Sequence, residues 1–291
     1  MPTIAAVLIV KNESEVLDRC LSSVKGVDEI IICDTGSEDN TIEIAKKYTD
    51  KVYTDFKWND RFCDARNHAK AKTTCDWILS IDADEYLHDF SKVQEAVKLA
   101  EEAKALAVDI TLVAEDNGQE HFFPRLFKNM PQVWWEGAVH NHLSVIGERL
   151  GDVRITFGYS PAHHKDPDRA FRILSKEVNT RPDAVRETFY LGREYWYRQE
   201  FDKCLIEMGK YVQKSRYLAE KADAFLIMGR CYWALKMGDD ARDATVQALI
   251  INPEFKEAIT FMSEIVWPKH AGQWQRMAAT ATNDDVLFKR A

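Results

Sequence analysis

The chain has 291 residues, enough for one large domain or two domains of ordinary size. Hydrophobic residues make up 46% of the sequence, so a sizeable core can form, and the formal net charge is −8. This acidic balance argues against a broad nucleic-acid-binding surface, which favours a basic patch, but it leaves room for local basic sites. Nucleic acid is therefore an unexpected partner rather than an excluded one.

Two features bear on the compartment in which the protein works. The apolar run from Ile4 to Val10 has seven residues and no basic segment before it, so we expect a strand rather than a signal peptide or a membrane span. The six cysteines, at positions 20, 33, 63, 75, 204 and 231, form no CxxC pair, and several lie inside apolar runs. We therefore expect buried free thiols and a cytoplasmic protein.

Strands and helices are expected to alternate through the first half of the chain. Residues 3–10 form a continuous apolar run, as in a strand covered on both faces, and residues 14–24 have apolar residues at helical spacing. The alternation continues with strands at 28–37, 51–56 and 76–82 and helices at 38–49 and 64–73. This order predicts an α/β fold with a parallel sheet and right-handed crossovers.

Polar clusters follow three of these strands, at Lys11–Glu13, Asp34–Ser37 and Asp82–Glu85. Ligands of open α/β sheets bind beyond the carboxyl ends of the strands, so we expect the three clusters to converge on one crevice. Carboxylates are costly to bury, and hard oxygen ligands suit Mg²⁺ or Mn²⁺, so Asp82 and Asp84 predict a metal site. Neither glycine-rich phosphate loop, GxGxxG or GxxxxGK[ST], is present, which disfavours a Rossmann dehydrogenase or a P-loop NTPase.

Four segments in this order resemble successive blocks of the family 2 glycosyltransferases with the GT-A fold. They are "VLIVKNESEVLDRCLSSV", "VDEIIICDTGSEDNTIEIAKKY", "FCDARNHA" and "DWILSIDADEYL", and a looser resemblance continues through "PRLFKN" and "WWEGAVHNH". The resemblance implies a GT-A domain with a twisted, mostly parallel sheet and helices on both faces. It also implies transfer of a sugar from a nucleotide-sugar, with inversion, by an enzyme that holds a metal at a DxD motif.

The resemblance assigns roles to residues of the crevice. Asp34 would accept a hydrogen bond from the base of a uridine-type nucleotide, and Arg66 would reach the base or the diphosphate. Asp82 would face the ribose and the metal, and Asp84 would bind Mn²⁺ or Mg²⁺ directly. Glu85 would either orient this group or cap the next helix. The other expected donor-binding residues are Lys11, Asn12 and Glu13.

A second group of candidate residues lies in "VWWEGAVHNH". Inverting transfer needs a general base, and Glu136 is the best-placed carboxylate after the DxD block, with Asp152 as a weaker alternative. The tryptophans beside it are either core residues or a platform for a sugar. The resemblance implies that His140 binds the metal or a phosphate, although this chain has Asn141 where many relatives carry glutamate.

A basic segment follows in an otherwise acidic protein. It contains His163, His164 and Lys165 and continues to Arg169 and Arg172. Such a segment could close over a diphosphate, exclude water and stabilise the leaving group. The alternative is the solvated start of a helix.

The chain becomes helical throughout from about residue 184. Two segments align with Gly192 over Gly229, 37 residues apart, and a third helix pair is expected to start near Glu254. The spacing of small and large residues resembles the tetratricopeptide (TPR) pattern, so we expect domains at 1–172 and 173–291. Arg193, Trp196, Arg230 and Trp233 either pack in the core or line a concave surface for a macromolecular acceptor; the repeats could also form a homodimer.

The sequence leaves other functions open. The leading prediction is an enzyme, a metal-dependent hexosyltransferase that uses a nucleotide-sugar, with a UDP-sugar favoured, and an acceptor protein, peptide or glycan. A non-catalytic nucleotide-sugar-binding protein and a helical-repeat scaffold are the alternatives. The presence of Asp82, Asp84 and Glu136 favours the enzyme. A nucleotidyltransferase is disfavoured because no glycine-rich basic loop follows the first strand.

Overall fold

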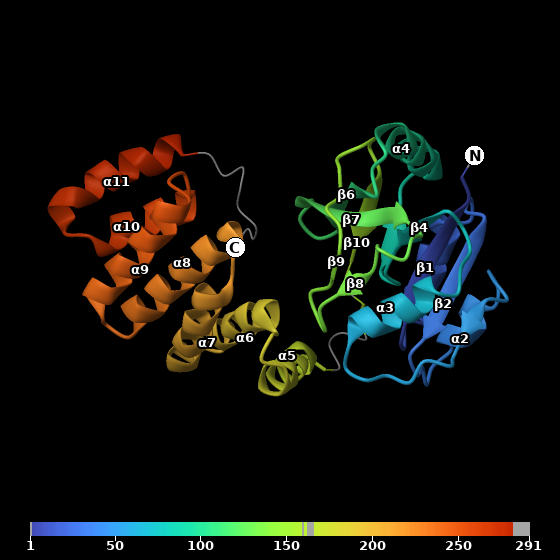
Figure 1. Cartoon of the computed structure of the whole chain (residues 1–291), viewed down its shortest axis with the longest axis horizontal. Coiled ribbons are helices and arrows are strands. Elements are labelled where there is room, and N and C mark those ends of the chain that lie inside the picture. Colours follow the sequence, from blue (N-terminus) through green and yellow to red (C-terminus); the bar gives the residue numbers. More distant parts are fainter. Residues whose placement is uncertain (1, 159, 162–165, 282–291) are drawn as a thin grey trace. The chain divides into compact units, whose positions relative to one another are not determined.

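The computed structural model describes residues 2–158, 160–161 and 166–281 (Figure 1). The chain forms two compact units, Met1–Arg169 and Ala170–Ala291, each with its own hydrophobic core. All six cysteines are free thiols, as predicted, and only Cys75 is partly exposed. In the part of the chain that the structure describes, no helix has both the length and the apolar character needed to cross a membrane.

The first unit is built on a sheet whose eight described strands lie in the order β3-β2-β1-β4-β7-β6-β10-β5 (Figure 1). Six of these strands run in one direction, and β7 and β5 run against them. The strands are β1 (Ile4–Val10), β2 (Glu29–Asp34), β3 (Val52–Tyr53), β4 (Trp77–Ser80), β5 (Glu85–Leu87), β6 (Ala107–Ala114), β7 (Glu120–Lys128) and β10 (Arg154–Phe157). A separate hairpin pairs β8 (Trp135–Glu136) with β9 (His142–Leu143).

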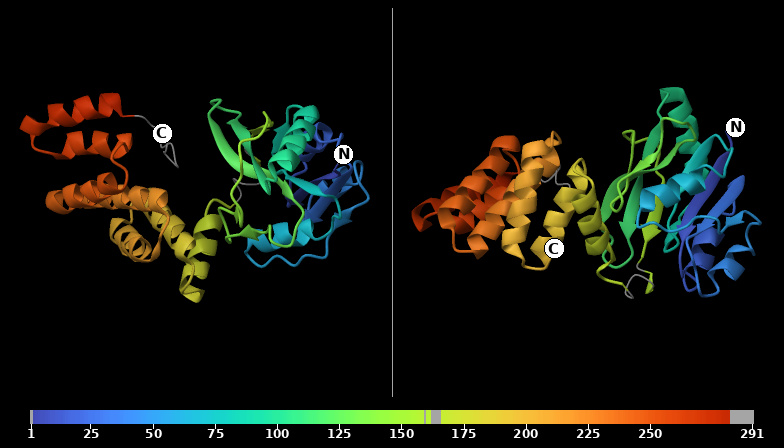
Figure 2. Two further views of the ribbon diagram at one scale, coloured as in Figure 1. Left: turned by 45° about the horizontal axis from the view of Figure 1, so that its top comes forward. Right: turned by 60° about the horizontal axis from the view of Figure 1, so that its bottom comes forward.

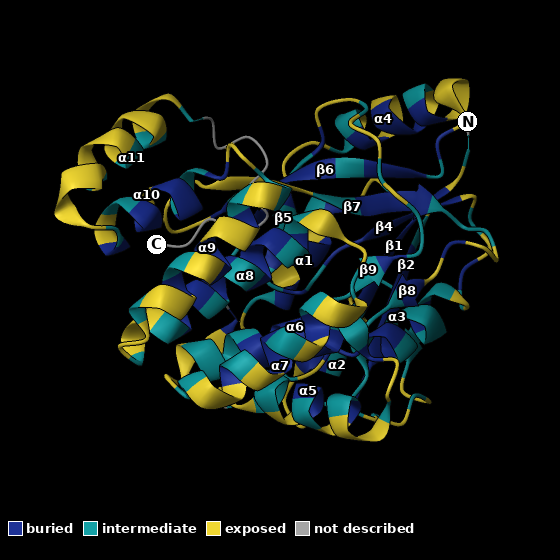
Figure 3. Cartoon of the chain, turned by 60° about the vertical axis from the view of Figure 1, so that its left-hand side comes forward, coloured by how far each residue is buried: buried dark blue, intermediate teal, exposed yellow. Residues whose placement is uncertain are grey.

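Helices cover both faces of this sheet, because successive side chains of a strand point to opposite sides. The helices are α1 (Leu17–Ser23), α2 (Thr41–Ala45), α3 (Phe62–Lys70) and α4 (Phe90–Ala103). On one face Ala6 and Leu8 of β1 belong to a core cluster with α1 and α4, and on the other face Ala5 and Val7 pack with α3 and the β8–β9 hairpin. Figure 3 shows the strands as largely buried and the outer helix surfaces as exposed.

The second unit consists of helices, as predicted (Figure 2). After α5 (Arg169–Thr180) the described helices form three consecutive pairs that pack on one another. The pairs are α6 (Val185–Tyr197) with α7 (Phe201–Lys214), α8 (Leu218–Ala234) with α9 (Gly238–Ile251), and α10 (Lys256–Ile265) with α11 (Pro268–Thr280). The third pair begins two residues after the expected start at Glu254. The predicted fold class, an α/β domain followed by TPR-like helices, is confirmed.

The repeated glycines explain why the helices of a pair can approach closely. A Cβ atom on Gly229 would lie 2.5 Å from Thr245 Oγ1, and one on Gly192 would lie 2.8 Å from Met208 Cε. Met208 and Thr245 are themselves 37 residues apart, as are the two glycines. Each glycine therefore provides the space for the equivalent side chain of the second helix in its own pair.

Candidate functional site

The three polar clusters of the first unit lie at one edge of the sheet. β1 lies between β2 and β4 and runs parallel to both, so the carboxyl ends of the three strands are adjacent. The loops that follow β1 and β2 are joined by hydrogen bonds: Asn12 N donates to Ser37 Oγ at 2.9 Å, and Glu38 N donates to Asn12 Oδ1 at 2.8 Å. Lys11, in the same loop, is exposed.

Asp34 is the last residue of β2, and only one of its two carboxylate oxygens accepts hydrogen bonds from the described residues. Its Oδ1 accepts hydrogen bonds from Gly36 N and Ser37 N, both at 2.9 Å. Its Oδ2 is buried and has no hydrogen-bond partner among the residues that the structure describes. Buried polar atoms are nearly always paired, so this oxygen indicates a donor that the described residues do not supply.

Asp82 lies between two arginines. Arg66 Nη2 donates to its Oδ1 at 2.7 Å, and Arg125 Nη2 donates to its Oδ2 at 2.9 Å. Burial opposes ionisation of this carboxyl, but the positive charges and hydrogen bonds of Arg125 and Arg66 outweigh it, and the pKa of Asp82 falls well below its usual range. Asp82 is therefore an oriented anion with one guanidinium on each oxygen.

Glu85 supports the turn that carries Asp82. Its Oε2 accepts a hydrogen bond from Asp82 N at 2.8 Å, and its Oε1 lies 2.9 Å from Arg125 Nη2. Burial raises the pKa of Glu85 to about 7, although the charge of Arg125 acts in the opposite direction. The next helix, α4, is capped instead by Asp89, whose side chain accepts a hydrogen bond from Ser91 N. Of the two predicted roles for Glu85, the structure therefore favours the first: it orients the turn Asp82–Glu85, which we call the acidic turn.

Two further carboxylates meet at Ser160. Asp84 Oδ2 accepts a hydrogen bond from Ser160 N at 3.2 Å, and Glu13 accepts one from the Ser160 hydroxyl. Burial raises the pKa of Glu13 to about 7; the hydrogen bond from Ser160 lowers it, and the charges of Asp84 and Asp82 raise it further. A cation bound beside Asp84 would relieve this accumulation of negative charge, so the oxygen ligands present fit Mg²⁺ or Mn²⁺.

The described residues do not, however, form a complete metal site on their own. No group of three or more His, Cys, Asp or Glu side chains in this part of the chain is arranged to hold a metal ion. The structure thus does not bring Asp82, Asp84 and His140 together as a ligand set. His140 is exposed in the loop between β8 and β9 and has a positive φ of 50°.

The β8–β9 hairpin is fixed against α3 beside the same edge. The side-chain amide of Asn67 pairs with the backbone of Trp135: Trp135 N donates to its Oδ1 at 2.8 Å, and its Nδ2 donates to Trp135 O at 2.9 Å. Arg66 Nε donates to Asn141 Oδ1 at 3.3 Å, and the Arg66 guanidinium lies 5.1 Å from the Trp135 ring centre. Arg66 therefore links the hairpin to Asp82.

Glu136 is accessible in this hairpin. Its side chain is 44% exposed, and His142 Nε2 lies 3.3 Å from its Oε2. Trp134 is exposed, whereas Trp135 is buried, with its ring 5.8 Å from that of Phe127 in a T-shaped contact. Of the two tryptophans, Trp135 is thus a core residue, and only Trp134 offers an indole face to solvent.

Asp152, the alternative base, lies at the opposite edge of the sheet. It precedes β10, which runs in the same direction as β4, whereas Asp82 follows β4. The site lies beyond Phe157, where β10 ends opposite Glu85, so five residues at about 3.3 Å each separate Asp152 from it. Asp152 instead pairs with Arg154 at 3.1 Å. It is therefore too far away to act as the base.

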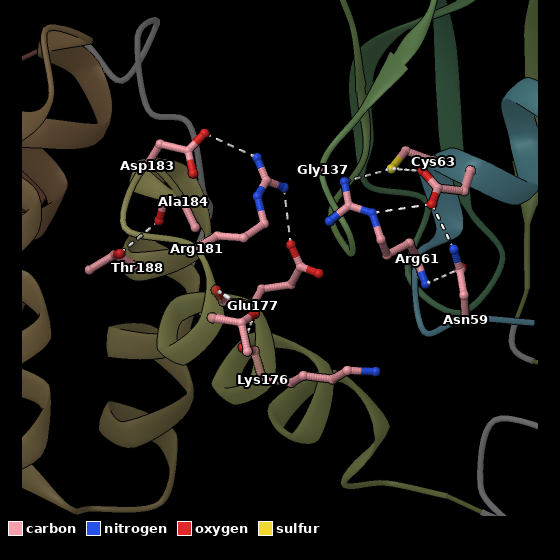
Figure 4. A network of polar contacts seen from close by, with 12 residues as sticks. Asn59, Arg61, Cys63, Gly137, Lys176, Glu177, Arg181, Asp183, Ala184 and Thr188 are labelled. Atoms are coloured by element: carbon pink, nitrogen blue, oxygen red, sulfur yellow. Dashed lines mark hydrogen bonds and ion pairs between the residues drawn. The ribbon is translucent and has the colours of Figure 1, made fainter.

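The basic segment is described only in part. His163, His164 and Lys165 lie outside the described residues. Arg169 begins α5, and its guanidinium lies 5.1 Å from the ring centre of Phe62, the first residue of α3. The start of α3 carries its own polar network, in which Arg61 Nε lies 3.3 Å from Asp64 Oδ2 and Asn59 Nδ2 donates to the same oxygen at 2.7 Å (Figure 4).

Several residues of the site were not singled out by sequence reasoning. They are Arg125, Asn67 and Ser160. Arg125 and Asn67 lie in the segments "PRLFKN" and "FCDARNHA", so the resemblance did mark their surroundings. An arginine between apolar residues, as in "PRLF", is a usable signal, because a buried arginine requires an acidic partner. Ser160 carried no such signal.

The family model described as Glycosyl transferase family 2 matches residues 5–158, just over half of the chain. An uncharacterized glycosyltransferase from Rickettsia felis is 40% identical over 226 residues, which cover 76% of this chain and 76% of that protein.

Two other relatives match over smaller shares of their own length. The glycosyltransferase SunS of Bacillus phage SPbeta is 29% identical over 211 residues, 66% of this chain and 49% of SunS. A TPR repeat-containing protein of Synechococcus elongatus is 40% identical over 144 residues, 48% of this chain and 35% of that protein. The match to this chain thus spans less than half the length of each of these two relatives.

Proposed function

The chain belongs to glycosyl transferase family 2, and on that basis we propose that its first unit is an inverting hexosyltransferase that uses a nucleotide-sugar donor, with a UDP-sugar favoured. The acceptor is a protein, a peptide or a glycan. The residues at the carboxyl ends of β1, β2 and β4 would form the donor crevice, in agreement with the position of ligands in other α/β sheets.

The buried Oδ2 of Asp34, which has no partner among the described residues, is the observation that carries this proposal. A pyrimidine base such as uracil has a ring N–H that would supply the missing donor. In the neighbouring turn Gly36 has a φ of 110°, and apart from its chain neighbours no described atom lies within 4 Å of the position of an added Cβ. Asp34 therefore has an acceptor without a partner among the described residues, in a turn with open space at Gly36.

Asp82 and its two arginines would orient the ribose and the start of the diphosphate. Because both carboxylate oxygens already accept from guanidinium groups, Asp82 is better suited to accept a sugar hydroxyl than to bind a metal directly. Asp84 is the better metal ligand and would hold Mg²⁺ or Mn²⁺ beside the diphosphate of the donor. When bound, that cation would neutralise the charge on the departing diphosphate.

Glu136 would act as the general base. It is solvent-accessible, as an acceptor-facing carboxylate must be, and the hairpin that carries it is joined to the donor side through Arg66 and Asn141. It would take the proton from the acceptor group as that group attacks the anomeric carbon. His142, 3.3 Å from Glu136, would orient the carboxylate.

Calorimetric titration of the full chain with UDP, with and without Mn²⁺, tests this function. We expect binding that is tighter with the metal, a loss of that metal effect in Asp84→Asn, and weaker binding in Asp34→Ala under both conditions. Equal affinity with and without metal, or no binding, would refute the metal-dependent donor site. Metal-dependent binding without any hydrolysis of UDP-sugars would instead indicate a non-catalytic nucleotide-sugar-binding protein.

The helical unit would serve the acceptor rather than the chemistry. We propose that it positions a macromolecular acceptor or forms a homodimer, because Asp34, Asp84 and Glu136 all lie in the first unit. Surface substitutions on the helices should then reduce transfer or alter the oligomeric state while slow donor hydrolysis remains. A helical-repeat scaffold without any donor binding is the remaining alternative, and the calorimetric titration distinguishes it.

A further inference from the structure

The second unit contains a groove that no step of the proposed reaction uses. It has a volume of about 500 Å³, which lies in the range of about 300–1,000 Å³ typical of ligand pockets. Its walls come from α6, α8 and α10, the first helices of the three pairs. The lining residues that matter for its chemistry are Trp196, Arg230, Trp233, Lys256, Glu257 and Glu264.

Two indole rings face this groove at equivalent positions of the repeat. Trp196 lies four residues after Gly192, and Trp233 lies four residues after Gly229. The glycines serve the packing within each pair, whereas Trp233 remains 45% exposed. Packing of the repeat therefore does not account for Trp233, and an exposed aromatic ring in a concave site is typical of a binding surface.

The charges around the groove cancel. Arg230 Nη2 lies 3.4 Å from Glu257 Oε2, and its guanidinium lies 5.8 Å from the ring centre of Phe261. Lys256 and Glu264 add one charge of each sign, and neither has an ion-pair partner among the described residues. Two cations and two carboxylates give no net attraction for a nucleic acid or a nucleotide, and none for a strongly basic peptide.

A neutral sugar chain fits this combination of surfaces. One face of a pyranose ring consists of C–H groups, whose slight positive charge is attracted to the negative face of an indole. Its hydroxyl groups both donate and accept, so they can pair with carboxylates and with a guanidinium or ammonium group at the same time. An apolar peptide would instead bury Lys256 and Glu264 and would also remove the Arg230–Glu257 pair from water, which is costly.

We propose that the groove between α6, α8 and α10 binds a neutral oligosaccharide, with its sugar rings stacked on Trp196 and Trp233. This site is separate from the donor crevice, and binding there does not require transferase activity. The proposal therefore stands or falls independently of the proposed function.

Titration of the full chain with a panel of short neutral oligosaccharides, followed by tryptophan fluorescence and calorimetry, tests this inference. At least one oligosaccharide should bind, and Trp233→Ala should lower the affinity for it by about tenfold, equivalent to ~1.4 kcal/mol. Trp233→Phe should retain part of the affinity, because a ring remains to stack. Trp267→Ala is the matched control, since Trp267 is 67% exposed but does not line the groove, and its affinity should be unchanged.

Three results would overturn the proposal. The first is that no neutral oligosaccharide of the panel binds, and the second is that Trp233→Ala binds as tightly as the unmodified chain. The third is that Asp84→Asn abolishes the binding, which would place the sugar in the donor crevice. If short peptides or anionic oligosaccharides bind through Trp233 and neutral oligosaccharides do not, the groove is a site for that other class of ligand. Thermal unfolding of each variant verifies that it is folded.

Discussion

Arg125 Nη2 lies 2.9 Å from Asp82 Oδ2, although the two residues are 43 positions apart in the sequence. The same nitrogen lies 2.9 Å from Glu85 Oε1, so one buried guanidinium holds both ends of the acidic turn. It can do so because β7 pairs with β4, with Leu126 opposite Leu79, which places Arg125 beside the end of β4.

Replacing Arg125 with alanine is expected to destabilise the first unit and to weaken donor binding. Removal of one partner of a buried ion pair costs about 3–5 kcal/mol, because Glu85 is left without its countercharge. Arg154→Ala is the matched control: Arg154 is 39% exposed and pairs with Glu120 at the surface, so its loss should cost far less than that of Arg125. Urea unfolding measures the loss of stability in both variants. Adding Glu85→Gln to Arg125→Ala should recover part of the lost stability; no recovery would contradict the ion-pair explanation.

Glu136→Gln is expected to abolish most of the transfer while UDP affinity stays unchanged. A positioned base contributes about 10²–10⁴ to the rate, and its amide cannot take the acceptor proton. Calorimetry with UDP and a transfer assay separate the two effects. Asp152→Asn, at the opposite edge of the sheet, should leave both unchanged. If Glu136→Gln turns over as fast as the unmodified chain, another residue is the base.

Gly229→Ala is expected to destabilise the helical unit by about 1–3 kcal/mol, because the added Cβ would lie 2.5 Å from Thr245 Oγ1 and 3.1 Å from the backbone oxygen of Ala241. Gly209→Ala is the opposite case within the same unit. Nothing lies within 4 Å of its added Cβ, so it should stabilise α7 by about 0.5–1 kcal/mol. Thermal unfolding of both variants gives the sign, and two effects of equal sign would refute the close-packing explanation.

The contribution of Asp39 to stability is expected to depend on pH. Burial opposes its charge, but hydrogen bonds from Thr41 and Ser14 outweigh it and lower the pKa of Asp39 from 3.8 to about 2. A lowered pKa in the folded state stabilises the fold above the unfolded pKa, and this contribution disappears as the pH falls through about 2.

Asp39→Asn should therefore reduce the free energy of unfolding at neutral pH, with a difference that shrinks as the solution is acidified below the unfolded pKa. Urea unfolding at several pH values measures this difference. Asp50→Asn is the control, since Asp50 is exposed and has no side-chain hydrogen bond within the described residues. A difference for Asp39→Asn that stays constant with pH would contradict the prediction.

The sequence predicts the first four strands and their polar ends because these signals are local. An apolar run such as Ile4–Val10 indicates a buried strand, and the polar cluster after it marks the edge where ligands bind. The partners of Asp82 were not predictable in the same way. Arg125 reaches it only through the antiparallel pairing of β7 with β4, a pairing between segments far apart in the chain.

Other residues could be assigned to the site only once the direction of each strand was known. In the sequence Asp152 and Glu136 are both carboxylates that follow the DxD block, and the position of Glu136 ranks it higher without excluding Asp152. The structure does, because Asp152 lies at the beginning of a strand that runs parallel to β4 and is therefore at the far edge. Asn141 likewise could not be assigned from its identity alone, and its contact with Arg66 appears only once the hairpin is placed.

The short connection from β4 to β5 constrains the shape of the sheet. Ser80 and Glu85 are five Cα steps apart, which span at most about 18 Å, yet in the described sheet β7, β6 and β10 lie between their strands, a flat distance of about 19 Å. The connection is not extended, because Glu85 N donates to Asp82 O in a turn. The sheet must therefore curl until β5 meets α1, where Leu87 N donates to Ser23 Oγ at 3.0 Å. The acidic turn thus limits the distance between β4 and β5 across the curled sheet. An inserted residue there would change the curvature of the sheet as well as the positions of the carboxylates.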